Sequence, residues 1–476
     1  MAADSSPALW WVRRDLRLAD NPALRAAIDE GGGVLPLFVL DPVLLRSAGH
    51  ARKAWMLAAL HALDSDLREG GGPGLSVVRG KPANAVPRVA QASGATSVHI
   101  SADFAPYGRA RDQAVQQELA RFDIELRRTG SPYAVAPGTL SSASGEPFQV
   151  FSPFYRAWLD HGVHDPAPAV PVGSVRWLKA DDQDFVEDPD PELAQLAGET
   201  SARKAWQAWL TKDAKGVSDY ERLHDFPGLD ATSHLSIALR WGHLHPRTVL
   251  GDLAPLRSKG AIALARQISW RDFFADTLFH RPDAVTEPIR PEFSRMPTDE
   301  PERSKAAAER LQAWQQARTG YPLVDAGMRQ LQAEGWMHNR VRMVVASFLI
   351  KDLHIGWWHG AEWFMSYLRD GDIAQNQLNW QWVAGCGTDP APYFRVFNPV
   401  TQSEKFDANG TYIRRYIPEL AEVPDEHLHQ PWQAPNGLPA GYPEPIVDHA
   451  AERKEALDRY AATRSERPLD QGDLGK

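Results

Sequence analysis

The sequence predicts an α/β domain with a parallel sheet, followed by a second domain made only of helices. Two patterns lead to this fold class. Short apolar runs alternate with helical stretches over residues 1–134, and from residue 201 to residue 476 the pattern is helical, interrupted by Pro and Gly. Residues 135–200 are rich in Pro, Gly, Ser and Asp, a composition typical of a long surface linker. We therefore predict domains at 1–134 and 201–476, joined by the interdomain linker 135–200.

Five apolar runs are the expected strands of the sheet. Helical stretches such as Ala54–Leu67 and Arg109–Phe122 separate them. Strands that alternate with helices form βαβ units, whose ligands bind at the carboxyl ends of the strands. The expected strands are residues 8–16, Val34–Leu40, Leu75–Val78, Ser97–Ile100 and Ile124–Arg128.

The end of the first expected strand carries charge rather than glycine. Arg13, Arg14 and Asp15 stand where a dinucleotide-binding dehydrogenase would have the pattern G-x-G-x-x-G. The sequence therefore disfavours a nicotinamide-dependent dehydrogenase.

The composition indicates a soluble protein of a reducing compartment, which we expect to be cytoplasmic. Cys386 is the single cysteine, so no internal disulfide can form. The amino terminus shows no secretory signal, and the longest apolar stretch, Met343–Ile350, is too short to span a bilayer. The net charge of −9 disfavours non-specific coating of nucleic acid but leaves a local basic groove open. No motif with metal-ligand spacing is present, so we predict no metal.

The stretch Asp370–Trp382 carries the most specific chemical signal. As a helix it places Asp372, Asn376 and Trp380 at i, i+4 and i+8, on one face. A carboxylate can hold a ribose or a cation, an amide can bond a ring nitrogen, and an indole can pass an electron to a neighbouring redox ring. The alternative is a polar helix start followed by ordinary Trp packing.

Two other stretches place polar groups where a ligand can bind. Residues 230–239 put hydroxyl groups at a helix start, where free N–H groups and the helix dipole suit a pyrophosphate, although Thr and Ser are also ordinary N-caps. Gln267, Trp270, Arg271 and Phe274 fall at i, i+3, i+4 and i+7 of a helix. An amide, an indole and a guanidinium on one face suit a flat, hydrogen-bonding ligand such as a base.

Three further segments, taken with 370–382, resemble the photolyase/cryptochrome family. They are Thr319–Leu331, Gly335–Arg340 and Gly387–Pro399, and they keep the family's order. The resemblance covers nearly the whole chain and is closest to the class I cyclobutane pyrimidine dimer photolyases. It implies a Rossmann-like antenna domain and an all-helical catalytic domain that binds FAD.

The resemblance also implies which residues contact FAD. Arg342 is expected beside the flavin, where its charge favours an anionic reduced flavin and where it can pair with Asp370 or Asp372. Such an Arg–Asp pair is equally consistent with a purely structural role. The expected FAD contacts are Tyr220, Thr232, Ser233, His234, Leu235, Ser236, Trp270, Arg271, Arg342, Asp370, Gly371, Asp372 and Asn376.

Four residues are implied to act in catalysis: Asn376, Trp380, Trp357 and Gln267. Asn376 is expected at the flavin N5, where plant cryptochromes have an Asp that can donate a proton, and this difference favours repair over signalling. Trp380 and Trp357 match the proximal and middle members of the family's electron path. The distal Trp is missing from its expected place about ten residues before Trp314, so we expect photoreduction either to use another exit, such as Trp358, Trp363 or Tyr367, or to be inefficient. Gln267 replaces the family's usual Glu and cannot ionise.

The resemblance places Trp270 and Trp382 as walls around a flipped pyrimidine dimer, which photolyases extrude from the duplex. His338 matches the dimer-repair type rather than the type that acts on (6-4) lesions. The expected DNA contacts are Gln267, Trp270, Arg271, Phe274, Trp336, Asn339, Arg340, Trp382 and Arg395.

A second, light-harvesting chromophore is implied for the first domain. The segment Asp103–Asp112 lacks the Asn-Glu pair of family members that bind a folate, so it resembles the type that binds 8-hydroxy-5-deazaflavin. A folate and an empty site are the alternatives, and Asp41, Arg52 and Arg111 would also suit solvated surface charges. The candidate antenna contacts are Val39, Asp41, Arg52, Asp103, Arg111 and Arg240.

We therefore predict a deoxyribodipyrimidine photo-lyase that acts as a monomer on UV-damaged DNA. In the implied mechanism the antenna passes excitation to reduced FAD, the flavin donates an electron to the dimer, the ring splits and the electron returns. The main rival is a blue-light receptor of the same fold, which Asn376 and the lack of a long tail before Lys476 disfavour. A flavin oxidoreductase and a structural nucleic-acid-binding module are further rivals.

Overall fold

The computed structural model describes residues 6–170, 172–181, 183–184, 186–389 and 394–465. The chain divides into two compact units. Unit 1 comprises Met1–Leu223, Ala231–Pro282 and Ser366–Ala374, and unit 2 comprises His224–Asp230, Asp283–Met365 and Gln375–Lys476. Part of the predicted motif Gly387–Pro399, residues 390–393, lies outside the described residues.

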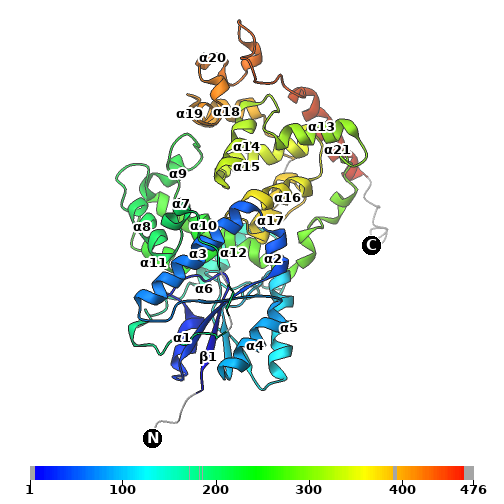
Figure 1. Ribbon diagram of the computed structural model, residues 1–476. Coiled ribbons are helices and arrows are strands. Elements are labelled where there is room, and N and C mark those ends of the chain that lie inside the picture. The colour runs from blue at the N-terminus through cyan, green and yellow to red at the C-terminus, as the bar shows by residue number, and fades with distance from the viewer. Residues whose placement is uncertain (1–5, 171, 182, 185, 390–393, 466–476) are drawn as a thin grey trace, which may run out of the picture. The chain divides into compact units, whose positions relative to one another are not determined.

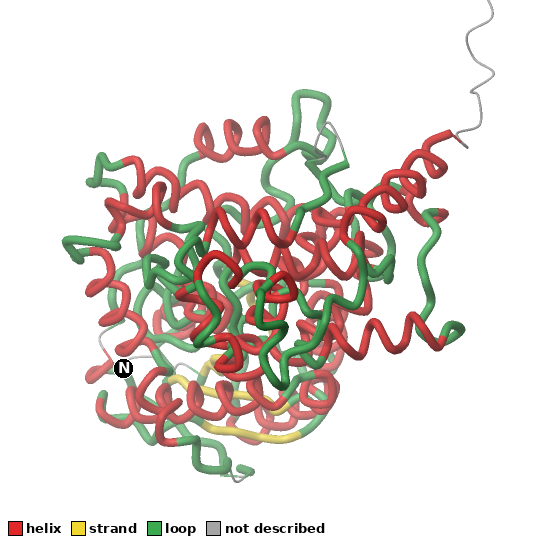
Figure 2. The backbone as a smooth tube through the Cα atoms, turned by 90° about the horizontal axis from the view of Figure 1, so that it is seen from above, coloured by secondary structure: helices red, strands yellow, loops and turns green. Residues whose placement is uncertain are grey.

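Five parallel strands form a single sheet in unit 1 (Figures 1 and 2). The strand order is β3-β2-β1-β4-β5, so β1 pairs with β2 on one side and with β4 on the other. The strands are β1 (Ala8–Val12), β2 (Val34–Leu40), β3 (Ser76–Arg79), β4 (Ser97–Ile100) and β5 (Glu125–Arg128). The predicted parallel α/β sheet is confirmed, and the charged residues that follow β1 lie at its carboxyl edge.

Helices cover each face of the sheet. Successive residues of a strand point to opposite faces, so neighbouring residues belong to different cores. Trp10 packs in one core with residues of α1 and α3, and Trp11 packs in the other with residues of α4 and α5. Both indoles are almost fully buried. The first helices are α1 (Pro22–Asp29), α2 (Pro42–Ser47), α3 (His50–Glu69), α4 (Pro82–Ser93) and α5 (Pro106–Ala120).

The segment expected to be a linker contains ordered helices. Phe151, Phe154 and Trp158 of α6 are buried, so this amphipathic stretch packs as part of unit 1. The sequence signal was a spacing of i, i+3 and i+7 within a Pro-rich region. The elements between residues 135 and 200 are α6 (Phe151–His161), the short turn η1 (Val172–Ser174), α7 (Pro191–Leu196) and the start of α8 (Glu199–Leu210).

The rest of unit 1 is helical. Trp206 and Trp209 of α8 form a core with Leu235, Leu239 and Leu264. The elements are η2 (Val217–Asp219), α9 (Tyr220–Leu223), α10 (Leu235–Trp241), α11 (Pro246–Leu253) and α12 (Lys259–His280).

From residue 282 onward the described chain is helical, as predicted. Trp314, Phe348 and Tyr412 are among its largest fully buried side chains. The α-helices are α13 (Lys305–Gln315), α14 (Pro322–Glu334), α15 (Asn339–Ser347), α16 (Trp357–Tyr367), α17 (Ile373–Ala384), α18 (Pro399–Phe406), α19 (Thr411–Tyr416), α20 (Asp425–Leu428) and α21 (His449–Ser465). The shorter turns are η3 (Pro282–Val285), η4 (Pro291–Arg295), the π-helical η5 (Phe348–Asp352), η6 (Pro418–Leu420) and η7 (Pro431–Gln433).

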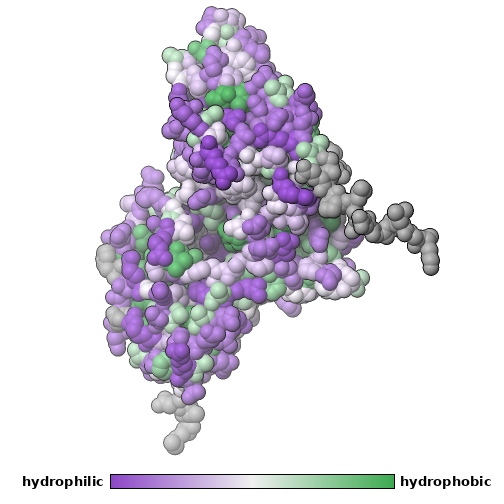
Figure 3. Space-filling view, turned by 90° about the vertical axis from the view of Figure 1, so that its right-hand side faces the viewer, coloured by the Kyte–Doolittle hydropathy of each residue, from purple (hydrophilic) through white to green (hydrophobic). Residues whose placement is uncertain are grey.

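Hydrophilic side chains dominate the face drawn in Figure 3, with hydrophobic residues in small groups. None of the helices described has the length and apolar character needed to cross a bilayer. Within the same residues, no group of three His, Cys, Asp or Glu side chains is arranged to hold a metal ion.

Candidate functional site

Two arginines follow the carboxyl end of β1 and form buried ion pairs within unit 1. Arg13 Nη1 lies 2.5 Å from Asp112 Oδ1, and Arg14 pairs with Asp372. Asp112 is 1% exposed and Asp372 is 5% exposed. Burial alone would lower the pKa of Arg14, but Asp372 together with Tyr133 and Asp103 raises it overall. The Arg14–Asp372 pair therefore joins residues that lie 358 positions apart in the sequence.

The predicted antenna residues gather at this same edge of the sheet. Arg111 lies 3.1 Å from Asp103 Oδ2, and Asp41 caps α2 by accepting from the Val43 N–H at 2.9 Å. Burial would raise the pKa of Asp103, but the charges of Arg111, Arg14 and Arg13 lower it overall. Val39 lies one residue before the end of β2 and is buried.

Arg52 and Arg240 complete the basic group. Arg52 Nη2 donates to Ser47 O at 3.0 Å, and Arg240 Nε donates to Gly371 O at 2.7 Å. Burial and the neighbouring Arg14 lower the pKa of Arg240 to about 9, with Asp372 opposing this shift. The alternative that Asp41, Arg52 and Arg111 are solvated surface charges is wrong, because all three side chains are largely buried. An anionic ligand would relieve the repulsion among these guanidinium groups.

The predicted pyrophosphate segment precedes a short helix. α10 begins at Leu235, its N-cap is His234 with φ of 50°, and the His234 side chain makes no capping hydrogen bond. Thr232 and Ser233 therefore lie before the helix, whereas Ser236 is an exposed residue of its first turn. Tyr220 packs edge-to-face against Trp209, with ring centroids 5.8 Å apart.

The four predicted residues lie on α12 and differ in exposure: the first is exposed, the second is half-buried, and the last two are buried. Trp270 stacks on Phe151 with centroids 3.7 Å apart, so one indole face is already covered. Arg271 donates to Pro132 O at 2.9 Å and to Leu239 O at 3.3 Å. Gln267 is exposed, and Phe274 is buried against Trp270. The DNA contacts assigned to this face stay predictions.

The stretch 370–382 enters helix α17 only at Ile373. Asp372 precedes the helix and accepts from the Ala374 N–H at 3.0 Å, so it is an end residue rather than part of the helical stripe. In unit 2, Asn376 Nδ2 donates to Ala361 O at 2.9 Å and to Gln377 Oε1 at 2.8 Å. Because the NH₂ group is committed to protein acceptors, Asn376 presents its amide oxygen, which can only accept.

Aromatic residues surround Trp380 in unit 2. Its ring lies 5.0 Å from the Phe364 ring and 6.3 Å from the Trp314 ring. Trp357 is buried, and the adjacent Trp358 is 45% exposed with its ring 6.2 Å from that of Trp357. Buried and exposed indoles are thus neighbours on α16, while the route between Trp380 and Trp357 stays a prediction.

Residues at the start of α15 are mostly accessible. Asn339 is exposed, and Arg340 pairs with Asp225 at 2.7 Å while its guanidinium lies 4.4 Å from the Phe406 ring centroid. Arg342 Nε donates to Met337 O at 2.7 Å, and its expected pair with Asp370 or Asp372 stays a prediction.

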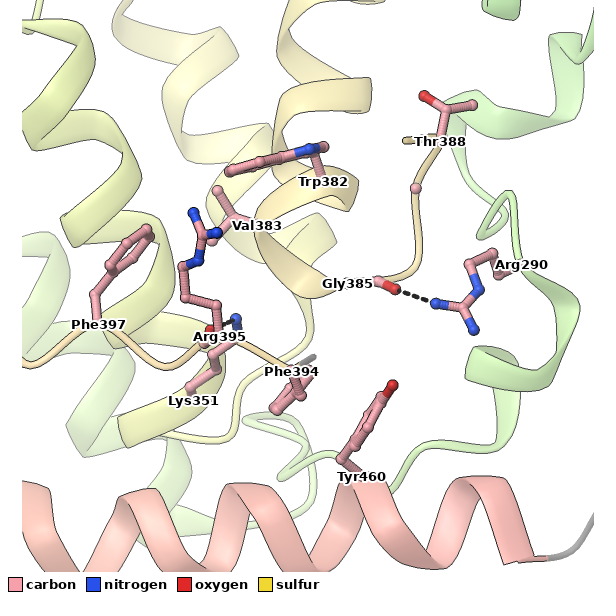
Figure 4. Close-up of a pocket in the computed structure, with 11 residues that line it drawn as sticks. Arg290, Lys351, Trp382, Val383, Gly385, Thr388, Phe394, Arg395, Phe397 and Tyr460 are labelled. Carbon is pink, nitrogen blue, oxygen red and sulfur yellow. Dashed lines mark hydrogen bonds between the residues drawn. The ribbon is translucent and has the colours of Figure 1, made fainter. Parts of the chain in front are cut away.

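Trp382 and Arg395 line one pocket of unit 2 (Figure 4). Trp382 is half-buried and Arg395 is exposed. The predicted sandwich with Trp270 stays a prediction, because Trp270 belongs to unit 1. Trp336, which is also half-buried, packs edge-to-face with His338 at 6.3 Å.

Sequence reasoning missed two features. The Arg14–Asp372 pair joins distant segments, and its only local signal was a charged triplet directly after a buried strand. Lys351 directly follows the apolar stretch Met343–Ile350 and was given no role, yet it lines the pocket beside Trp382. No local pattern separates such a buried lysine from a surface one.

The fold and the buried arginines at the carboxyl edge of the sheet define an α/β-plus-helical protein suited to an anionic ligand. A family model described as the FAD binding domain of DNA photolyase matches residues 264–462, and one described as DNA photolyase matches residues 8–172. A deoxyribodipyrimidine photo-lyase of Streptomyces griseus is 43% identical over 450 residues, which cover 92% of this chain and 96% of that protein. The chain belongs to the DNA photolyase family.

Solved structures agree with this assignment. A bacterial class III photolyase from Agrobacterium tumefaciens has a TM-score of 0.86 and 36% identity, covering 98% of this chain and 99% of that chain. An archaeal photolyase from Sulfolobus tokodaii, described with two FAD molecules, has a TM-score of 0.83 and 28% identity, covering 96% and 100%.

The residues present fit FAD. In unit 1, Thr232 and Ser233 directly precede the start of α10, where hydroxyl groups and the N–H groups of a helix start suit a pyrophosphate. In unit 2, Asn376 offers an oxygen to a ring N–H, which matches the hydrogen carried by N5 of a reduced flavin.

Proposed function

We propose that this protein repairs cyclobutane pyrimidine dimers in DNA with light, as a deoxyribodipyrimidine photo-lyase. The observation that carries the proposal is the similarity along almost the whole chain to proteins of that name. The FAD-binding domain supplies the cofactor site that such an enzyme needs. Reduced FAD, when bound and excited by light, supplies the electron that opens the dimer ring.

The chain's own residues would orient the flavin and withhold a proton from it. Asn376 would accept a hydrogen bond from the flavin N5–H and has no proton to give, since both Nδ2 hydrogens are held by Ala361 O and Gln377 Oε1. Trp380 follows Asn376 by four residues on α17 and packs against Phe364 and Trp314. An immobile amide that cannot donate favours a fully reduced, anionic cofactor, which is the better electron donor.

The lesion is held by indoles and polar side chains. Trp270 keeps one face free of Phe151, and we propose that this face and Trp382 enclose the extruded dimer. Gln267 bonds a pyrimidine edge, while Trp336, Asn339, Arg340 and Arg395 contact the surrounding strand. Buried Arg271 and Phe274 support the helix face that presents Trp270. Stacking of a base on an aromatic ring is worth about 1–3 kcal/mol.

We propose the class I dimer-repair type and an 8-hydroxy-5-deazaflavin antenna at the edge formed by Val39, Asp41, Arg52, Asp103, Arg111 and Arg240. The buried guanidinium groups there support an anionic chromophore. A folate, a second FAD or no antenna are the outcomes that an absorption spectrum of the purified protein separates. We further propose a cytoplasmic monomer.

The test compares light with darkness. Purified, reduced protein is incubated with an oligonucleotide that contains one dimer, and the intact dimer is measured by chromatography. We expect loss of the dimer only in light and slower loss with Trp382→Ala, because one stacking wall is removed. Equal persistence of the dimer in light and darkness, with FAD bound, would favour the blue-light receptor.

A further inference from the structure

A pocket of unit 2 combines cations with aromatic walls (Figure 4). The pocket is open, and the space between its lining residues is about 490 Å³ when the adjoining solvent is included. Trp382, Phe394 and Tyr460 form its walls, and Phe394 stacks on Tyr460 with centroids 4.3 Å apart and planes at 13°. Rings on several sides suit a flat or apolar ligand body.

The polar lining favours an anion. Arg290, Lys351 and Arg395 line the pocket, and none of the described residues that line it is Asp or Glu. Glu292, outside the lining, pairs with Arg290 at 2.9 Å. Thr388 is 5% exposed, and its Oγ1 has no hydrogen-bond partner among the described residues. A buried hydroxyl without a partner in a basic pocket indicates a missing polar ligand group.

Lys351 lies in the π-helical turn η5 and is 2% exposed. Its Nζ donates to Arg395 O and lies 4.4 Å from the Phe394 ring centroid. Burial and the neighbouring Arg395 lower the pKa of Lys351 to about 7, with Asp352 and Cys386 opposing this shift. A buried lysine of this kind holds a lone pair near neutral pH, which is the condition for a nucleophilic amine.

We propose that this pocket binds phosphate-bearing aldehydes and that the Lys351 amine condenses with them to a reversible imine. Arg290, Arg395 and Thr388 hold the phosphate, and the aromatic walls hold the body of the ligand. Two kinds of ligand carry both a phosphate and an aldehyde: a small phosphorylated aldehyde, and the ring-opened deoxyribose of an abasic site in DNA.

The step balances without an oxidant or a further reactant. The neutral Nζ adds to the aldehyde carbon and a proton moves to the oxygen, giving a carbinolamine. The C–O bond then breaks, water leaves with that oxygen, and a C=N bond forms. Water reverses the reaction, so an added hydride donor is needed to make the bond permanent.

This activity goes beyond dimer repair and needs no light, so its failure leaves the repair proposal untouched. The FAD-loaded protein is incubated in the dark with pyridoxal 5′-phosphate and sodium cyanoborohydride, which reduces the imine to a secondary amine. The labelled lysines are then mapped by mass spectrometry. Pyridoxal, which lacks the phosphate, is the matched probe.

We expect most of the label on Lys351 at pH 7, because an exposed lysine of pKa about 10.4 holds roughly a thousandfold less neutral amine. Pyridoxal should label Lys351 about tenfold less, since charge-assisted phosphate contacts are lost. Labelling of Lys351 should rise through pH 7, and that of Lys305, which is 91% exposed, should rise only at much higher pH.

Two variants and a second substrate complete the test. Lys351→Met should lose the label, whereas Lys305→Met should keep it. Trapping of an abasic oligonucleotide on Lys351 assigns the source to DNA, and trapping of pyridoxal 5′-phosphate alone assigns it to small aldehydes. Label spread over exposed lysines with Lys351 unmodified overturns the proposal, and because this mapping uses the unaltered protein, it stands even if Lys351→Met does not fold.

Discussion

Replacing Asn376 by Asp tests the part of the site on which repair depends. Asn376 is 8% exposed, and its Nδ2 donates to Ala361 O at 2.9 Å and to Gln377 Oε1 at 2.8 Å. Asn376→Asp removes both donors and leaves two buried oxygens facing a carboxyl group. Each unsatisfied buried acceptor costs about 1–3 kcal/mol.

Protonation of the introduced carboxyl restores one of the two hydrogen bonds. That gain of about 1–3 kcal/mol raises the pKa of the carboxyl by roughly 1–2 units, and burial raises it further. A carboxylic acid with a proton then stands where the amide has none to give. The second acceptor stays unsatisfied, so the free energy of unfolding should fall by about 1–3 kcal/mol.

The assay records visible spectra during photoreduction, together with denaturant unfolding. We expect the spectrum of Asn376→Asp to shift from that of an anionic to that of a protonated flavin, and light-driven repair to slow. The matched control is Asn379→Asp on the same helix, where Asn379 is exposed and donates only to Gln375 O at 2.7 Å. Unchanged spectra in Asn376→Asp with FAD bound, or the same shift in both variants, would refute the assigned role.

Four further outcomes follow from the structure. Gly360→Ala should lower stability by about 1–3 kcal/mol, because its Cβ would lie 2.1 Å from Trp380 Cη2, while Gly173→Ala, whose nearest atom is 4.0 Å away, should be near neutral in the same denaturant titration. Arg14→Met should cost about 3–5 kcal/mol by removing the guanidinium that pairs with the buried Asp372 carboxylate, measured by denaturant unfolding against the exposed Arg121→Met. In the unfolded chain Lys351 is protonated between pH 7 and 10, whereas burial lowers the pKa of folded Lys351 to about 7. The free energy of unfolding of Lys351→Met should therefore rise relative to that of the unaltered protein by about 1.4 kcal/mol per pH unit as pH falls from 10 to 7. A difference in unfolding free energy that does not change with pH would contradict this. Trp314→Ala should cost about 3–5 kcal/mol, since Trp314 is fully buried and packs on Phe364 and Trp380, and a smaller loss in thermal unfolding would argue against that packing.

The sheet was predictable because its strands are short apolar runs with clear boundaries. Val34–Leu40 and Ser97–Ile100 form strands with the predicted bounds, whereas the first strand ends at Val12 because its charged continuation turns into ion pairs. Helix α6 was not predicted because it lies in a Pro-rich segment, whose composition is typical of a linker. The helical spacing of its aromatic residues is weak evidence by itself, and the helix is stabilised by the burial of Phe151 and Trp158.

The candidate site was predictable in its residue types but not in its contacts. The spacing of Asp372, Asn376 and Trp380 gave the chemistry, yet Asp372 lies outside the helix and faces Arg14, which no local pattern could reveal. The antenna residues were found through resemblance, and their burial depends on the sheet edge that brings Asp41, Asp103 and Arg111 into one unit. Lys351 could not be singled out from the sequence either, because its lowered pKa results from its burial in the folded protein.

An action spectrum of repair tests the central claim most directly, because it asks which bound molecule collects the light. The rate of dimer loss per absorbed photon is measured at a series of wavelengths with reduced protein and a dimer-containing oligonucleotide. The account predicts a rate that follows the absorption of the reduced flavin, with an added band if a second chromophore is bound. Dimer loss that ignores the flavin's absorption, or none at any wavelength from flavin-loaded protein, would contradict it.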